Sequence, residues 1–243
     1  MADQTPSSSV AITTSGKDYL SQSATVLADA FANDPAITYL LNVLPPSKQD
    51  PYRHTLFNAF YTGAALNGAS FTEADEWRCV GVLLPPGKNV DNPLTLVQSG
   101  LFGVLWNLGI KGVWRMTHEY ASKPATLKSR TLETHSKKAY YIFNLGTKEE
   151  YRGNGLSTHL IHHYQSLAAA TNAPIWLEAT TAYSHNLYTK LGFHTAGEIV
   201  LGQGVAGADG TVSKGGEGVK IWGMVWWPPV KKEEEEIVVY RTG

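Results

Sequence analysis

From residue 140 onward, two kinds of hydrophobic pattern alternate along the chain. Short apolar runs that are typical of strands alternate with stretches in which apolar residues recur every three or four positions, as in amphipathic helices. The predicted order is strand, helix, strand, helix, strand, strand, over 140–146, 155–170, 174–179, 183–191, 194–201 and 220–226. Because such alternation packs helices against a sheet, it restricts this half of the chain to an α/β architecture.

The amino-terminal half also mixes helical and strand patterns. Strands are predicted at 10–14, 69–73 and 77–84, and helices at 19–31, 39–44, 54–66 and 94–118. The dipeptide Asp34-Pro35 is expected to interrupt the helical pattern, and the glycine-rich segment 202–218 is expected to be a long flexible loop. No repeat or linker divides the chain. We therefore expect one domain over 10–230, with a disordered segment at 1–9 and a charged tail at 231–243.

Composition argues against several classes of protein. The 243 residues carry a formal net charge of −1, whereas proteins that bind nucleic acids usually have a strong basic excess. The single cysteine, Cys79, cannot form an internal disulfide. The longest apolar stretch, around 100–110, is too short to cross a bilayer, and the first residues lack the pattern of a secretory signal. We expect a cytoplasmic protein that binds neither nucleic acid nor a membrane.

The segment between the strand at 140–146 and the helix at 155–170 is a turn that contains glycines. Unpaired N–H groups and a partial positive charge at the start of a helix suit an anion, and glycines let the backbone approach it closely. The turn is therefore either a diphosphate cradle or a plain connection. It is not a P-loop, because no Gly-Lys-Ser/Thr is present. The Gly-x-Gly-x-x-Gly at 202–207 precedes no helix, which argues against a dinucleotide site there.

Two motifs resemble those of the GNAT superfamily of acyl-CoA-dependent N-acyltransferases. Arg152-x-x-Gly155-x-Ser157 is similar to its Q/R-x-x-G-x-G/A signature, with Ser157 where Gly or Ala is usual. The segments 176–181 and 184–193 are similar to its closing motif, a strand followed by a helix that bears Leu-Tyr and ends in Gly-Phe. The resemblance implies a mixed, mostly antiparallel twisted sheet with helices on both faces, and a cofactor-binding core at 140–193.

The resemblance also implies acetyl-CoA as the acyl donor. Its diphosphate would be held by the turn and its pantetheine arm by the preceding strand, with further contacts from the helix at 183–191. The implied cofactor residues are Phe143, Asn144, Leu145, Arg152, Gly153, Asn154, Gly155, Leu156, Ser157, Ser184 and Asn186. The chain departs from the family at Thr181, where many members have Asn, and at Ser184, where Ala is common.

Direct attack of an amine on the thioester is the chemistry that the resemblance implies. Tyr188 stands where the family has a tyrosine that protonates the leaving thiolate, and free phenol and thiol pKa values of about 10 and 8.5 permit that exchange. A backbone N–H of the strand at 140–146 would bind the developing oxyanion. Glu178 is the first choice as general base, although a chain of water molecules would also remove the proton. No metal is expected, since His159 and His163 lack a third ligand.

The acceptor is expected to be a small amine. Phe31, Asp34 and Tyr141 are the candidate residues, because aromatic rings with a carboxylate suit a cation that has an apolar body. The segments 31–35 and 84–87 are similar to a branch of small-molecule acetyltransferases that includes antibiotic-resistance enzymes. Two alternatives stay open: a non-catalytic acyl-CoA-binding module and a protein N-acetyltransferase. A homodimer is compatible with the predicted edge strands and apolar helices.

Overall fold

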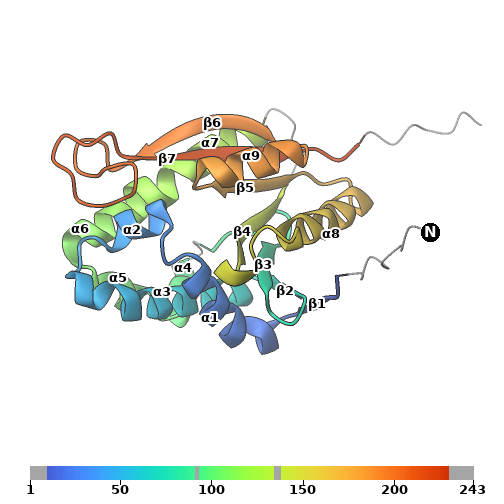
Figure 1. The fold of residues 1–243 in the computed structure, drawn as a ribbon, viewed down its shortest axis with the longest axis horizontal. Coiled ribbons are helices and arrows are strands. Elements are labelled where there is room, and N and C mark those ends of the chain that lie inside the picture. The colour runs from blue at the N-terminus through green and yellow to red at the C-terminus, as the bar shows by residue number, and fades with distance from the viewer. Residues whose placement is uncertain (1–9, 91–92, 134–137, 230–243) are drawn as a thin grey trace, which may run out of the picture.

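The computed structural model describes residues 10–90, 93–133 and 138–229 (Figure 1). The predicted disordered segment at 1–9 and the predicted tail at 231–243 lie outside the described residues. Strands from both halves of the chain form one seven-stranded sheet in the order β1-β2-β3-β4-β5-β7-β6. The strands are β1 (Ile12–Ser15), β2 (Ser70–Ala74), β3 (Cys79–Leu84), β4 (Tyr140–Thr147), β5 (Ile175–Ala179), β6 (His194–Leu201) and β7 (Val219–Trp226). All neighbouring pairs are antiparallel except β4 and β5, so the predicted mixed, mostly antiparallel sheet is confirmed.

Helices cover both faces of this sheet, as expected (Figure 1). They are α1 (Leu20–Ala30), α2 (Pro35–Leu41), α3 (Pro46–Leu66), α4 (Pro93–Gln98), α5 (Leu101–Asn107), α6 (Gly109–Trp114), α7 (Ser122–Glu133), α8 (Leu156–Ala170) and α9 (Ala182–Lys190), with a π-helical segment at Arg115–Ala121 between α6 and α7. Among the described residues, no helix has both the length and the apolar character needed to cross a membrane.

Strand β3 shows why the two faces are both apolar. Side chains alternate along a strand, so every second residue points to the same face. Val80 and Val82 belong to the core that α1 and α3 form, whereas Leu83 packs in the cluster that contains side chains of α8. All six residues of β3 are buried, which explains the continuous apolar run in its sequence.

The apolar stretch expected as one helix at 94–118 is broken into shorter helices. Gly100 has φ 73° and Gly109 has φ 68°, and a left-handed residue ends the regular helical hydrogen bonding. The chain then continues through the π-helical segment into α7, which the sequence patterns did not predict. The expected interruption at Asp34-Pro35 is confirmed, since α1 ends at Ala30, but the second helix begins at Pro35 rather than at residue 39. The Asp34 side chain accepts hydrogen bonds from the N–H groups of Ala36 and Ile37, and a proline is favourable in the first turn.

The segment between β6 and β7 is folded, in contrast to the long flexible loop expected from its glycines. Backbone hydrogen bonds join Gly204 N to Gly216 O at 2.8 Å and Gly218 N to Ala206 O at 2.8 Å. The Asn42 amide donates to Gly210 O at 2.7 Å, which attaches the loop to the end of α2. The glycines serve close packing here rather than flexibility, since a Cβ at Gly210 would lie 2.1 Å from the Pro35 carbonyl oxygen.

A buried carboxylate, Glu119, ties this loop to the helices. It accepts hydrogen bonds from the hydroxyl of Tyr39, from the N–H of Gly202 at 3.1 Å and from the Lys123 ammonium at 3.0 Å. Burial by itself raises the pKa of Glu119, but the hydrogen bonds from Tyr39 and Lys123 outweigh it, and the net pKa lies below the usual value. The ionised carboxylate therefore stabilises the contact between α2, α7 and β6.

We predict that Glu119→Gln lowers the free energy of unfolding at neutral pH by about 1–3 kcal/mol, because the amide loses the charge and brings an N–H group toward existing donors. A group whose pKa is lowered by folding stabilises the protein above its unfolded pKa of about 4.3, and that contribution disappears as the pH falls through the folded pKa. Urea unfolding is monitored by circular dichroism at several pH values. The difference in free energy of unfolding between the variant and wild type should become smaller at acidic pH. Glu133→Gln, at an exposed position of α7, is the control, and an equal loss in both variants would contradict the assignment.

Candidate active site

The two parallel strands β4 and β5 are in register for only two residue pairs. Tyr140 pairs with Ile175 and Tyr141 with Trp176. Beyond these pairs, β4 stays paired with β3 and β5 with β7, so the two strands separate. In the described part of the sheet, the edge of β4 from 142 to 147 therefore has no strand partner on the β5 side, and its N–H and C=O groups on that edge are available to a ligand.

A β-bulge lies in the same part of β4. Val82 pairs with Asn144, but the next residue, Leu83, pairs with Ile142, so Phe143 is an extra residue on β4. A bulge bends its strand and redirects the groups beside it. No glycine or proline marks this position in the sequence, and for that reason the bulge was not predicted.

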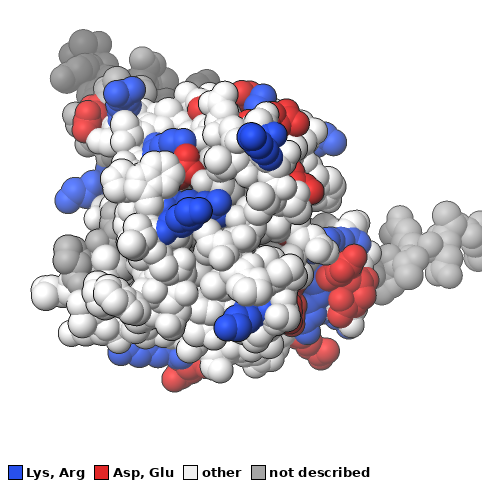
Figure 2. Space-filling model, turned by 90° about the vertical axis from the view of Figure 1, so that its left-hand side faces the viewer, with Lys and Arg blue, Asp and Glu red and all other residues white. Residues whose placement is uncertain are grey.

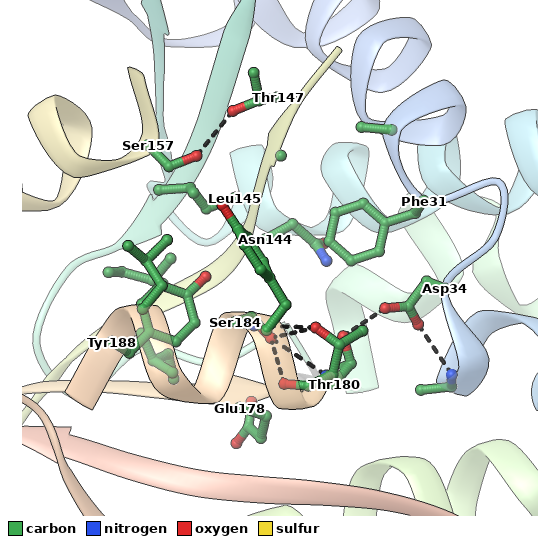
Figure 3. A pocket seen from close by; sticks show the side chains of 18 of the residues that line it. Phe31, Asp34, Asn144, Leu145, Thr147, Ser157, Glu178, Thr180, Ser184 and Tyr188 are labelled. Carbon is green, nitrogen blue, oxygen red and sulfur yellow. Dashed lines mark hydrogen bonds between the residues drawn. The ribbon is translucent and has the colours of Figure 1, made fainter. Parts of the chain in front are cut away.

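A cavity of about 890 Å³ occupies the space between the separated strands. It is lined by β4, the turn before α8, the segment after β5, α9 and the chain around the start of α2 (Figure 3). Among the residues predicted from the sequence, it brings together Phe31, Asp34, Tyr141, Phe143, Asn144, Leu145, Arg152, Gly153, Gly155, Leu156, Ser157, Glu178, Ser184 and Tyr188. Asn154 and Asn186 do not line it: the Asn154 amide donates to Tyr151 O at 3.3 Å, and Asn186 is exposed on α9.

One end of the cavity is the start of α8. Gly153 and Gly155 have φ of 83° and 76°, and a Cβ at either position would meet nothing within 4 Å. Gly155 is the N-cap and has no side chain with which to cap the helix. The first hydrogen bond of the helix is the one that the His159 N–H donates to Gly155 O, at 3.1 Å. The preceding N–H groups of the first turn are thus open to the cavity, and they form a suitable site for an anion.

Side chains around this turn hold it in place. The Arg152 guanidinium donates to Ala30 O at 3.0 Å and to Thr147 O at 3.4 Å, which joins the turn to α1 and to the end of β4. The hydroxyl groups of Ser157 and Thr147 are 2.8 Å apart. In this structure the side chain of Arg152 thus positions the turn through main-chain contacts.

The other end of the cavity contains two carboxylates, Asp34, which is buried, and Glu178, which is half-buried. Asp34 is 8% exposed, caps α2 and accepts a hydrogen bond from the hydroxyl of Thr180 (Figure 3). Glu178 accepts hydrogen bonds from the indole of Trp176 and from the Tyr141 hydroxyl, the latter at 2.8 Å. Burial raises the pKa of both carboxyl groups above their usual values, although their hydrogen bonds oppose the shift.

Tyr120 completes this end of the cavity and was missed by the sequence analysis. It lies on the π-helical segment, and burial, followed by the charges of Asp34 and Glu178, raises the pKa of its phenol. Its position follows from the unexpected continuation of the helical chain beyond residue 118, which no local pattern signalled. Thr180 was also missed, because its hydrogen bond to Asp34 joins residues that are far apart in the sequence.

Tyr188 lies on α9 between the two ends and is 7% exposed. Figure 3 shows its ring below Leu145, at the wall of the cavity. Burial raises the pKa of Tyr188 above the ordinary value of 10, so its phenol is protonated at neutral pH. No other described residue forms a hydrogen bond with its hydroxyl. On the same helix, Ser184 forms a capping box with Thr181, which defines where α9 begins.

Comparison with known proteins identifies the family. Residues 108–193 match the model of the Acetyltransferase (GNAT) family. The matched region is that of a GNAT acetyltransferase domain. The family resemblance seen in the sequence is thereby confirmed, and with it the acyltransferase class. An uncharacterized N-acetyltransferase of Schizosaccharomyces pombe is 24% identical over 177 residues, which are 73% of this chain and 71% of that protein.

Solved structures show the same GNAT fold. Arylalkylamine N-acetyltransferase 2 from Aedes aegypti aligns with a TM-score of 0.61 at 17% identity, covering 90% of this chain and 99% of that one. Polyamine N-acetyltransferase from Drosophila melanogaster aligns with a TM-score of 0.59 at 14% identity, covering 90% and 100%. A histone acetyltransferase HPA2 and related acetyltransferase from Corynebacterium glutamicum aligns with a TM-score of 0.57 at 20% identity, covering 93% and 99%.

The cavity fits acetyl-CoA, the acyl donor that the GNAT family implies. A diphosphate matches the open amides at the start of α8, beside two glycines that leave the space for it free. The unpaired edge of β4 matches the amide groups of a pantetheine arm, which hydrogen-bond as an added strand would. Within the described residues, no cluster of three or more His, Cys, Asp or Glu side chains could hold a metal ion.

We predict that Gly155→Val weakens acetyl-CoA binding at least about tenfold, because a branched side chain would fill the open space beside the first turn of α8 and strain its left-handed backbone. Gly215→Val is a matched control: Gly215 lies in the β6–β7 loop, has φ 75°, and a Cβ there would also meet nothing within 4 Å. Isothermal titration calorimetry measures both. If the two variants bind acetyl-CoA with equal affinity, the diphosphate does not bind at this turn.

Proposed function

We propose that this GNAT enzyme transfers the acetyl group of acetyl-CoA to the amine of a small molecule, with donor and acceptor bound together. The observation that carries the proposal is the continuity of the cavity, which extends from the open start of α8 to the carboxylates Asp34 and Glu178. A donor bound at the first end and an acceptor bound at the second would meet beside Tyr188. Holding two reactants side by side is itself a large part of the catalysis in such a reaction.

The acceptor end favours a small cationic amine. Phe31, Tyr120 and Tyr141 supply aromatic surface, while Asp34 and Glu178 supply carboxyl groups at the same end of the cavity. Two of the similar structures are named for amine acceptors, an arylalkylamine and a polyamine, which supports the same substrate class for this chain.

The amine attacks in its neutral form, so a cationic acceptor first loses one proton to the solvent. Two further proton transfers accompany the attack itself. When bound, acetyl-CoA supplies an activated acetyl group. The amine nitrogen forms a bond to the acetyl carbon, the carbon–sulfur bond breaks, and the nitrogen loses a proton while the sulfur gains one. We assign the proton that reaches sulfur to Tyr188, and the proton that leaves nitrogen to Glu178, directly or through water. N–H groups on the open edge of β4 would bind the carbonyl oxygen as negative charge develops on it.

Thiol release in the presence of a panel of amines tests the proposal. The panel contains arylalkylamines, polyamines and a lysine-containing peptide, and acetyl-CoA binding is measured in parallel by calorimetry. Release that depends on a small amine supports the proposal. Release with the peptide alone would favour a protein N-acetyltransferase, and binding without any release would favour a non-catalytic module.

We predict that Tyr188→Phe lowers kcat about 10- to 100-fold and leaves acetyl-CoA affinity nearly unchanged, because only the proton donor to sulfur is removed. Tyr183→Phe is the control, since Tyr183 lies on the same helix, lines the cavity and is largely exposed. Steady-state kinetics with the best amine of the panel measures both. An unchanged kcat in Tyr188→Phe would assign the proton to water or to another residue.

We predict that Glu178→Gln lowers kcat/KM about 10- to 100-fold and changes its pH dependence. The wild-type enzyme should lose activity as the pH falls through the raised pKa of Glu178, because the protonated carboxyl accepts no proton from the amine. The variant should lack this acidic limb. If the variant loses kcat/KM at low pH in the same way as wild type, this acidic limb belongs to a different group. The role of general base would then belong to that group as well.

A further inference from the structure

The segment that contains α5 and α6 is apolar on two opposite faces. Leu101, Val104 and Leu108 are buried in the core that α3 helps to form. Four other side chains of the segment are exposed to solvent: Phe102 by 64%, Trp106 by 74%, Ile110 by 90% and Trp114 by 52%. We call these four residues the apolar face. A surface helix normally carries polar residues opposite its buried stripe, so a second apolar stripe indicates a further contact.

The four residues form a series rather than isolated exposed side chains. Phe102 and Trp106 are four positions apart within α5, and Ile110 and Trp114 are four apart within α6, so each pair is separated by one helical turn. The left-handed Gly109 lies between the two pairs. The rings of Phe102 and Trp106 are stacked with their centroids 6.4 Å apart, and the ring of Trp114 stacks on that of His118 at 5.6 Å. Single exposed hydrophobic residues are common, but a contiguous apolar patch usually marks an interaction site.

Within the segment that carries the apolar face, the charged residues are all basic. No Asp or Glu occurs between residues 93 and 118, whereas Lys111 is exposed within α6 and Arg115 follows it. Arg115 is already engaged, since its guanidinium donates to Tyr39 O at 2.7 Å. Figure 2 shows a broad uncharged area on the lower left of this side of the molecule, bordered by Lys and Arg side chains and, at its lower edge, also by an acidic side chain.

We propose that the apolar face docks on the surface of a lipid bilayer that carries anionic headgroups. Indole rings prefer the boundary between headgroups and acyl chains, where their apolar body is buried and their N–H stays hydrated. Basic side chains beside them are attracted to anionic lipid. A symmetric contact with a second copy fits less well, because it would place Lys111 on both sides of the interface with no acidic residue of the same segment to pair with it. This inference departs from the expectation, drawn from the sequence, that the protein binds no membrane.

The test is cosedimentation of the full chain with vesicles of three parts phosphatidylcholine to one part phosphatidylserine, and with vesicles of phosphatidylcholine alone. We expect binding to the mixed vesicles, weaker binding to the neutral ones, and a decrease as salt is added. Lys111→Glu should weaken binding to the mixed vesicles about fivefold or more, since each basic residue near such a surface contributes about 1 kcal/mol, equivalent to about fivefold.

The double variant Trp106→Ser/Ile110→Ser should reduce vesicle binding at least about tenfold, because it removes two large apolar groups from the contact. Val205→Ser/Val212→Ser is the matched control, since both valines are exposed in the β6–β7 loop. All four positions lie outside the cavity lining, so acetyl-CoA affinity and the far-ultraviolet circular dichroism spectrum should be unchanged in both variants.

Three results would overturn the proposal. The first is the absence of vesicle binding by the wild-type chain, and the second is equal binding by the two double variants. The third is a wild-type dimer in sedimentation equilibrium that Trp106→Ser/Ile110→Ser converts to a monomer without any change in vesicle binding, which would assign the apolar face to a second copy. None of these results bears on the acetyl-transfer proposal, which is tested by acetyl-CoA binding and thiol release.

Discussion

The separation of β4 from β5 after two residue pairs is the constraint on which the rest of the site depends. Backbone groups that would join the strands instead border a cavity, and buried backbone groups need a partner. A ligand with amide groups of its own would supply that partner, which is why we propose the opening as the binding site of the acyl donor. The bulge at Phe143 reinforces it, because the extra residue bends β4 where the pairing with β5 ends.

The acceptor end is built from groups that also hold the fold together. Asp34 caps α2 and receives the hydroxyl hydrogen bond of Thr180, so one carboxylate joins the amino-terminal helices to the chain that follows β5. Glu178 is likewise fixed by Trp176 and Tyr141. Carboxylates held in this way keep their position when a substrate binds, and little reorganisation is then needed during the reaction. Under the proposed function, a substitution at Asp34 would therefore affect the stability of the fold and the binding of the acceptor together.

The apolar face and the cavity wall belong to one continuous piece of chain. After Trp114, the helical segment continues as a π-helix in which Glu119 anchors the β6–β7 loop and Tyr120 lines the cavity. The left-handed glycines at 100 and 109 divide this segment into short helices. One side of these helices is buried against α3, and the apolar face remains on the outside.

The sequence by itself determined the alternation of strands and helices after residue 140, the glycine turn before α8 and the position of Tyr188 on α9. These features rest on local signals: hydrophobic period, left-handed glycines and motif spacing act within a few residues. Only the tertiary structure decided the bulge at Phe143, the position of Tyr120 in the cavity wall and the hydrogen bond between Asp34 and Thr180. Each of these depends on contacts between distant segments, and the energy of such contacts comes from packing and burial, which no local pattern records.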